Sequence, residues 1–215
     1  MKDLREFIDG IEKLGELKVV EGANWEWELG AITYSMAKKA NPPALLFDKI
    51  EGYKPGYRVF TIPCSTDGRI ALLLGLPPEA HGIELVRKCR EKMAEPLVPV
   101  PPVEIKEAPV MQNVDTGDEV DMFKFPTPQW QPRDGGRYIG TGDTVIVKDP
   151  EEGWINVGQY RVQIHDKSTI TIFMEPGRHG NIIRKKYWQK GQSCPVVVTF
   201  GGDPLLVAMA GQPFS

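Results

Sequence analysis

The chain has 215 residues, of which 41% are hydrophobic, so it is long enough to bury a core in one large domain or two small ones. Its formal net charge is only −3 and its basic residues occur without runs, which argues against nucleic acid or a charged membrane surface as a partner. The longest apolar runs, at residues 71–74 and 195–198, fall far short of the roughly 20 residues that a membrane-spanning helix needs.

The amino terminus is charged and amphipathic and lacks the apolar segment of a signal peptide, so we expect a cytoplasmic protein. The three cysteines, Cys64, Cys89 and Cys194, are widely spaced and form neither a CxxC metal pair nor a disulfide framework. We expect them to be reduced, structural thiols, and we expect small molecules or proteins as partners.

The first hundred residues alternate between helical and extended patterns. Apolar residues recur at helical spacing from Leu4 to Leu14, which predicts a helix that Asp3 caps and Gly15 ends. In chain order we then expect a strand over residues 17–20, a helix over 26–40, a buried strand over 44–47, extended segments over 58–62 and 69–74, and a helix from Pro77 or Pro78 to about residue 92. This order is typical of an α/β domain.

Five prolines lie between residues 95 and 109, and this composition favours extended backbone over packed structure. We therefore predict a domain boundary there. The first domain, with the proline-rich linker, covers residues 1–108, and the second covers residues 109–215.

The second part is rich in β-forming residues divided by turn signals. Strands are expected over residues 138–139, 143–148, 154–164 and 168–174, followed by a helix over 179–190 and a strand over 195–200. This spacing favours an antiparallel barrel or sandwich, so the whole chain is predicted to be α+β.

Asn156 and Arg161 lie in a predicted strand hairpin. If Arg161 points into a cavity, its planar guanidinium could hold a carboxylate through two parallel hydrogen bonds. The alternative is a surface arginine paired with an acid, and the spacing alone favours that alternative.

His179 follows a strand and stands near the first turn of a predicted helix. Backbone N–H groups at such a position attract phosphate, and an imidazole can also bind a divalent metal. The alternative is a hydrogen-bonded structural histidine. If the fold brings Asn156 and His179 together, their oxygen and nitrogen ligands suit manganese or magnesium better than zinc.

A glycine-rich stretch over residues 133–143 lets the backbone approach a ligand closely, and Thr141 offers a hydroxyl group there. It matches neither a phosphate-binding P-loop nor a dinucleotide fingerprint, and a tight turn before a strand explains it equally well. No serine lies in a GxSxG elbow, so a serine hydrolase triad cannot be argued.

Taken in order, these segments resemble the UbiD decarboxylase family along the whole chain. The resemblance rests on LREF (4–7), KLGEL (13–17), PALLF (43–47), PVMQNV (109–114), DGGRYIGTG (134–142), NVGQYR (156–161), PGRH (176–179) and GGDP (201–204). It implies that the second domain is a split β-barrel related to flavin reductases. It also implies reversible decarboxylation of an aromatic or α,β-unsaturated carboxylic acid with prenylated FMN.

The resemblance also implies roles for particular residues. Asn156 and His179 match two ligands of a divalent metal, manganese or magnesium, that anchors the flavin phosphate with potassium nearby. Arg161 matches the arginine that contacts the flavin and the substrate carboxylate. The positions expected to line the flavin are Thr141, Gly158, Gln159, Tyr160, Arg178, Gly211 and Gln212.

As partners, the resemblance implies the acid and CO2, a flavin prenyltransferase that supplies the cofactor, and other copies of the chain in a homo-oligomer. The form of the motif at residues 134–138 is closer to members that act on phenolic and other aromatic acids than to those that act on cinnamic-type acids.

The chain departs from the family pattern in stopping near the midpoint of a full-length member. The third metal-ligand glutamate, the acid–base glutamate with its acidic partner, and the dimerisation domain would lie beyond residue 215. Two alternatives therefore stand beside the decarboxylase: a noncatalytic flavin-binding fragment that needs a second polypeptide, and a split-barrel flavin reductase.

Overall fold

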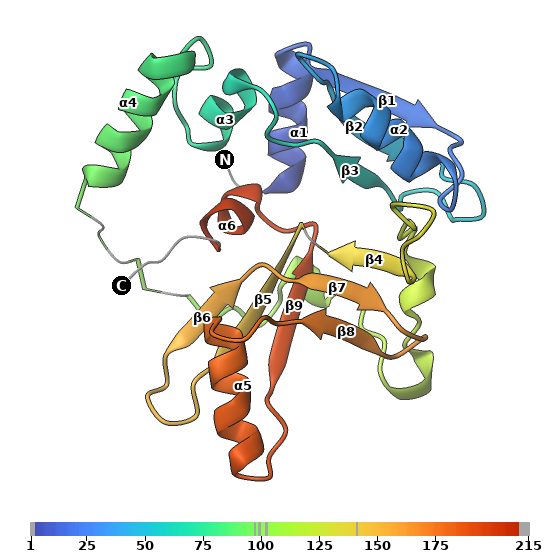
Figure 1. Cartoon of the computed structure of the whole chain (residues 1–215), viewed down its shortest axis with the longest axis vertical. Coiled ribbons are helices and arrows are strands. Elements are labelled where there is room, and N and C mark those ends of the chain that lie inside the picture. The colour runs from blue at the N-terminus through green and yellow to red at the C-terminus, as the bar shows by residue number, and fades with distance from the viewer. Residues whose placement is uncertain (1–2, 97, 99, 102, 141, 211–215) are drawn as a thin grey trace.

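The computed structural model describes residues 3–96, 98, 100–101, 103–140 and 142–210. Helices α1, α2 and α3 pack around a small sheet in the amino-terminal part with α4 against α3, and two further sheets with helix α5 form the second part (Figure 1). The helices are α1 (Leu4–Lys13), α2 (Glu28–Ala37), α3 (Asp67–Leu73), α4 (Gly82–Ala94), α5 (His179–Gln189) and α6 (Pro204–Met209), with short 3-10 helices η1 (Pro109–Met111), η2 (Gly117–Glu119) and η3 (Met122–Lys124). The strands are β1 (Leu17–Glu21), β2 (Ala44–Asp48), β3 (Val59–Thr61), β4 (Arg137–Gly140), β5 (Asp143–Lys148), β6 (Ile155–Gly158), β7 (Arg161–Ile164), β8 (Ile170–Phe173) and β9 (Val196–Phe200). These elements confirm the predicted α+β class.

The amino-terminal sheet has the order β1-β2-β3, and helices cover both of its faces. Strand β2 pairs in parallel with β1 and antiparallel with β3. Leu45 and Phe47 of β2 pack with Leu29 of α2, whereas Ala44 packs with Phe7 of α1. Because successive side chains of a strand point to opposite faces, one apolar strand serves two helical layers.

The prediction of an extended segment over residues 69–74 was wrong, because this segment belongs to helix α3. The side chain of Thr66 accepts a hydrogen bond from the Arg69 backbone N–H and so caps the helix. Ala71 and Leu73 are buried beside α1 and α4. A short apolar run reads equally well as a strand or as a buried helix, and here the cap decides in favour of the helix.

The next helix was predicted correctly in type but not in its start. Helix α4 begins at Gly82, not at Pro77 or Pro78, because Pro77 instead starts a turn in which its carbonyl accepts from the Ala80 N–H. His81 has extended backbone and precedes the first turn of α4. The described residues between α4 and η1 form no helix or strand, as expected for the proline-rich segment.

The second part contains two antiparallel three-stranded sheets, β4-β7-β8 and β6-β5-β9. Strand β5 is central in one sheet and β7 is central in the other. Helix α5 packs against β5 and β6, and α6 packs against β5 (Figure 1).

The predicted hairpin that contains Asn156 and Arg161 was wrong. Strand β6 pairs with β5, whereas β7 pairs with β4 and β8, so the chain passes from one sheet to the other between Gly158 and Arg161. A hairpin and a crossing of this kind share the same alternating pattern, and only the strand pairing distinguishes them.

Within the described ranges, every helix is too short or too polar to cross a lipid bilayer.

The cap of α3 gives a test of the fold. The hydroxyl group of Thr66 also donates to Glu16 at 2.6 Å, and so ties α3 to the start of β1. We expect Thr66→Ala to lower the free energy of unfolding by about 1 kcal/mol, measured by urea denaturation. Thr66→Ser keeps the hydroxyl group and should lose much less; equal losses in the two variants would contradict the role of the cap.

Candidate functional site

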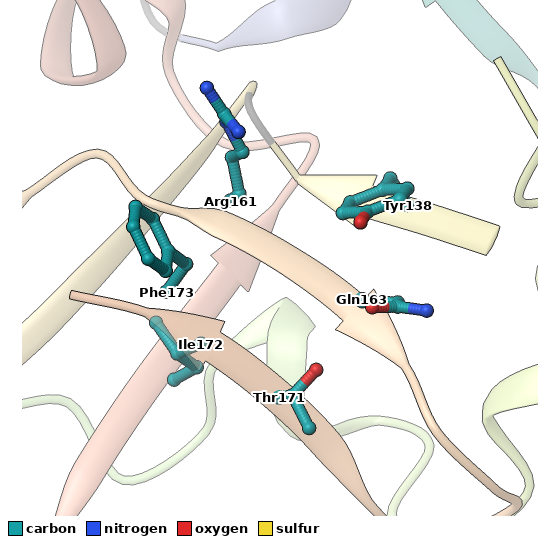
Figure 2. Close-up of a pocket in the computed structure, with 6 residues that line it drawn as sticks. All are labelled: Tyr138, Arg161, Gln163, Thr171, Ile172 and Phe173. Carbon is teal, nitrogen blue, oxygen red and sulfur yellow. The ribbon is translucent and has the colours of Figure 1, made fainter. Parts of the chain in front are cut away.

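A pocket of about 320 Å³ opens on the β4-β7-β8 sheet. Figure 2 shows its lining side chains, which come from all three strands. They are Tyr138, Arg161, Gln163, Thr171, Ile172 and Phe173. Of the suggested residues that the structure describes, Arg161 is the one that lines this pocket.

Strand pairing brings most of these side chains onto one face of the sheet. Arg161 lies opposite Phe173, and Gln163 lies opposite Thr171 on one side and Tyr138 on the other. Residues two apart on a strand point to the same face, so Arg161 and Gln163 both project toward the pocket. Val162, between them, is fully buried on the opposite face.

Arg161 is exposed and carries a charge that can reach a ligand. Its guanidinium carbon lies 5.8 Å from the centre of the Phe173 ring, within the range of a cation–π contact. Among the described residues, no carboxylate lies within ion-pair distance of Arg161. The alternative that Arg161 is a surface arginine paired with an acid therefore has no support among the described residues.

The glycine-rich turn is fixed against the pocket by Gln163. The Gln163 side-chain amide donates to the Gly135 carbonyl oxygen at 3.0 Å. A Cβ atom at Gly136 would stand 2.4 Å from the same amide nitrogen, so a larger residue would displace the Gln163 side chain. The backbone at Gly135 and Gly136 therefore makes its close approach to Gln163, a residue of the pocket wall.

The amino terminus of α5 is held by Tyr160. The Tyr160 hydroxyl accepts a hydrogen bond from the Gly180 backbone N–H at 3.2 Å. A Cβ atom at Gly180 would lie 2.6 Å from this hydroxyl oxygen. Tyr160 therefore fixes the first turn of α5, where free N–H groups and the helix dipole favour an anion.

His179, the first residue of α5, packs on Trp154. Their ring centres are 4.9 Å apart and nearly perpendicular, at 82°. Asn156 is buried, and its Nδ2 atom has no hydrogen-bond partner among the residues that the structure describes. Because side chains alternate along an extended chain, Trp154, Asn156 and Gly158 lie on the same side of the strand. Asn156 therefore lies between two residues that contact α5, Trp154 and Tyr160.

The remaining residues that the sequence suggested lie outside the pocket or outside the described part of the chain. Arg178 is exposed and lies 3.6 Å from the Glu175 carboxylate. Gly158 is buried against the Tyr160 ring, and Gln159 is exposed. Thr141, Gly211 and Gln212 lie outside the described residues. In the part of the chain that the structure describes, no three His, Cys, Asp or Glu side chains gather into a metal-binding group.

The candidates therefore fall into two groups. Arg161 belongs to the pocket, whereas Asn156 and His179 lie at the junction of β6 and α5 and do not line it. The two-residue crossing at Gln159 and Tyr160 joins the two groups.

An acidic and basic cluster holds the far half of α5 against the end of β5. Lys186 of α5 contacts Asp149 at 2.7 Å and Glu151 at 3.4 Å. The Lys186 ammonium, with the backbone N–H groups of Glu152 and Glu151, lowers the pKa of Asp149 to about 2. This cluster keeps α5 in place along the sheet.

Sequence reasoning missed a second buried acid, Asp143, at the start of β5. Its side chain is fully buried, and among the described residues no other residue hydrogen-bonds to its carboxylate oxygens. A Cβ atom at Gly140 would lie 2.7 Å from its carboxyl carbon. Burial raises the pKa of Asp143 to about 6.

The sequence reasoning also missed Tyr138, Gln163, Thr171 and Phe173 as pocket residues. The signal that could have found Gln163 is its spacing of two from Arg161. The other three depend on strand pairing, which the sequence does not specify.

The contact between Tyr160 and Gly180 can be tested directly. We expect Tyr160→Phe to lower the free energy of unfolding by about 1 kcal/mol, because the Gly180 N–H loses its acceptor. Chemical denaturation measures the loss. Tyr34→Phe, at an exposed position on α2, is the matched control and should be close to neutral. Equal effects of the two substitutions would argue against the contact.

Asp149 gives a test by pH. Its folded pKa of about 2 lies below the ordinary 3.8, so its contribution to stability is complete above pH 3.8 and disappears as the pH falls toward 2. We expect Asp149→Asn to reduce stability at neutral pH, and the gap to the unmodified chain to close across that window. Urea denaturation at several pH values measures this gap. Asp9→Asn, on the exposed side of α1, should leave the pH profile unchanged; a constant gap for Asp149→Asn would refute the assignment.

Comparisons with known proteins match both parts of the chain. The 3-octaprenyl-4-hydroxybenzoate carboxy-lyase N-terminal domain matches residues 8–89. The 3-octaprenyl-4-hydroxybenzoate carboxy-lyase Rift-related domain matches residues 102–215.

Individual relatives extend this result. The chain is 32% identical to a pyrrole-2-carboxylic acid decarboxylase of Pseudomonas aeruginosa over 98% of its own length and 44% of the relative's. The closed form of the vanillic acid decarboxylase of Sedimentibacter hydroxybenzoicus superposes with a TM-score of 0.90 at 30% identity, covering 100% of this chain and 46% of that one. An evolved dimeric form of the UbiD-class enzyme HmfF of Pelotomaculum thermopropionicum, in complex with prFMN, shares the fold with a TM-score of 0.80 at 24% identity, over 99% of this chain and 51% of that chain. The chain thus spans about half the length or less of these relatives, and it belongs to the UbiD carboxy-lyase family.

Proposed function

We propose that this chain binds prenylated FMN and orients the substrate of a carboxy-lyase that removes CO2 from, or adds it to, an aromatic or α,β-unsaturated carboxylic acid. The observation that carries the proposal is Arg161, whose guanidinium has no acidic partner among the described residues and stands beside an aromatic ring at the edge of a pocket. The decarboxylases of pyrrole-2-carboxylic and vanillic acid among the relatives favour an aromatic acid as the substrate.

The pocket suits an aromatic carboxylate. A planar guanidinium binds a carboxylate through two parallel hydrogen bonds, which also fix the plane of the acid. Phe173 and Ile172 supply apolar surface for a ring, and Gln163 and Tyr138 supply polar groups that can select its substituents. Arg161 would therefore hold the carboxylate in one orientation during the loss of CO2.

The junction of β6 and α5 fits the phosphate end of a flavin and its metal ion. Asn156 has a buried amide with an unpartnered end, and an amide can turn either its oxygen or its nitrogen to a ligand. His179 adds an imidazole, and Arg178 a positive charge, at a helix terminus that favours anions. We assign manganese or magnesium to Asn156 and His179, because an oxygen and an imidazole nitrogen suit these ions.

The crossing between the two sheets would lie beside the flavin. Gly158, Gln159 and Tyr160 join the metal-binding junction to Arg161, so we propose that they line the cofactor together with Thr141, Gly211 and Gln212. When bound, prenylated FMN supplies the electron sink that the loss of CO2 from an sp² carbon requires. The residues of this chain bind the acid, orient it and keep the charge of Arg161 near its carboxylate.

Several finer features belong to the same proposal. The two sheets would form a split β-barrel within a domain at residues 109–215, after an amino-terminal domain at 1–108. Resemblance alone supports potassium near the flavin phosphate, a flavin prenyltransferase as the cofactor supplier, a homo-oligomeric enzyme and a cytoplasmic location.

The cofactor can be tested by its spectrum. We expect the chain, made together with a flavin prenyltransferase, to retain a flavin whose absorbance and mass are those of prenylated FMN. Ordinary FMN with oxidation of a nicotinamide would instead indicate a flavin reductase. Protein without any flavin would contradict the binding proposal for this polypeptide.

Arg161 can be tested in an enzyme completed by the remaining part of the family's sequence. We expect Arg161→Ala to reduce turnover by a factor on the order of 10² or more, while the flavin remains bound, because the acid loses its orienting charge. Arg161→Lys keeps the charge without the planar fork and should recover only part of the rate. Arg90→Ala, at an exposed position on α4, is the control. Turnover of Arg161→Ala near the control rate would remove Arg161 from the mechanism.

A further inference from the structure

Arg137, at the start of β4, reaches out of its own sheet into the amino-terminal part of the chain. Its guanidinium carbon lies 4.1 Å from the centre of the Trp25 ring, and one of its nitrogens donates to the Tyr53 hydroxyl. Trp25 and Tyr53 both pack on the core that β2 forms with α2. The side chain of a β4 residue is therefore held by the amino-terminal part.

The second part of the chain holds the same guanidinium from the other side. Arg137 donates to the Thr127 carbonyl oxygen at 2.8 Å and to the Phe125 carbonyl oxygen at 3.0 Å. The Phe123 ring lies 5.2 Å away. These directed hydrogen bonds use the fixed fork of a guanidinium, which a lysine could not reproduce.

The next residue, Tyr138, lines the pocket, and its backbone is fixed by the same region. The Tyr138 N–H donates to the Pro128 carbonyl oxygen at 3.2 Å, and its carbonyl accepts from the Trp130 indole N–H at 3.0 Å. The Trp130 backbone in turn lies directly against Gly30 of α2, where an added Cβ would stand 2.2 Å from the Trp130 carbonyl oxygen. Two routes, through Arg137 and through Trp130, thus run from the amino-terminal part to Tyr138.

We propose that Arg137 is a positioning residue through which the amino-terminal part sets the place of Tyr138 in the pocket wall. Arg137 does not itself line the pocket, and it acts through the next residue, Tyr138. Tyr138 lies opposite Gln163 of β7, the strand that also carries Arg161. A shift of the amino-terminal part would move the β4 wall relative to the β7 residues that face the ligand. Docking of that part and ligand binding are then linked, and each strengthens the other.

This inference rests on the proposed function only in treating the pocket as the ligand site, and its test needs no ligand. The chain contains six tyrosines, so 3-fluorotyrosine gives a ¹⁹F spectrum in which Tyr138→Phe identifies the Tyr138 signal. Tyr187, whose hydroxyl donates to the Lys148 carbonyl oxygen on the far side of the second part, is the internal reference.

We expect Arg137→Gln to shift or broaden the Tyr138 signal while the Tyr187 signal stays in place. Tyr53→Phe removes one partner of the guanidinium and should move the Tyr138 signal in the same direction by less. Arg137→Lys should not restore the original spectrum, and Arg133→Gln, at an exposed arginine in the segment before β4, should leave it unchanged.

Thermal unfolding of each variant separates positioning from simple destabilisation. A lower melting temperature with an unmoved Tyr138 signal, or equal changes at Tyr138 and Tyr187, would overturn the proposal. If Arg137→Gln does not fold, the response of Tyr138 to Tyr53→Phe decides the question. A failure of flavin binding would contradict the proposed function but would not alter this spectrum.

Discussion

The passage of the chain from one sheet to the other at Gln159 and Tyr160 determines the arrangement of the candidate site. Only two residues separate β6 from β7, yet the strands pair with different neighbours. Asn156 therefore belongs to the sheet that α5 covers, and Arg161 belongs to the sheet that forms the pocket. Tyr160, within the crossing, fixes the start of α5, so the same short segment positions both groups of residues.

Local patterns predicted the elements well where burial and capping acted together. The helix at Leu4–Lys13 has an apolar stripe and a side-chain cap from Asp3, and strand β2 is buried along most of its length. The prediction for residues 69–74 was wrong because their apolar run has no period that distinguishes a helix from a strand. The helix is decided by the cap that the Thr66 side chain makes with the Arg69 backbone N–H, and Thr66 lies outside the segment. Local sequence patterns do not specify which strands pair across long distances in the chain.

The same difference applies to the site. The family resemblance singled out Arg161 and His179, whereas the spacing alone favoured a surface arginine, and both side chains are exposed in the structure. The sequence could not predict that Phe173 would face Arg161, since that depends on the register of β7 with β8. Nor could it predict the contact between Trp154 and His179, which depends on the packing of α5 along β6.

Two of the buried polar side chains, Asn156 and Asp143, have atoms without a hydrogen-bond partner in another described residue. Asn156 has an amide nitrogen without a partner, and Asp143 has two carboxylate oxygens without one. Burying such groups costs free energy, which a folded protein retains mainly where a ligand or a protonation state compensates for it. Burial raises the pKa of Asp143 to about 6, so protonation removes the buried charge as the pH falls below about 6. Asn156 cannot lower its cost in this way, because an amide does not titrate in this range, and its place beside the amino terminus of α5 is where we propose the metal ion.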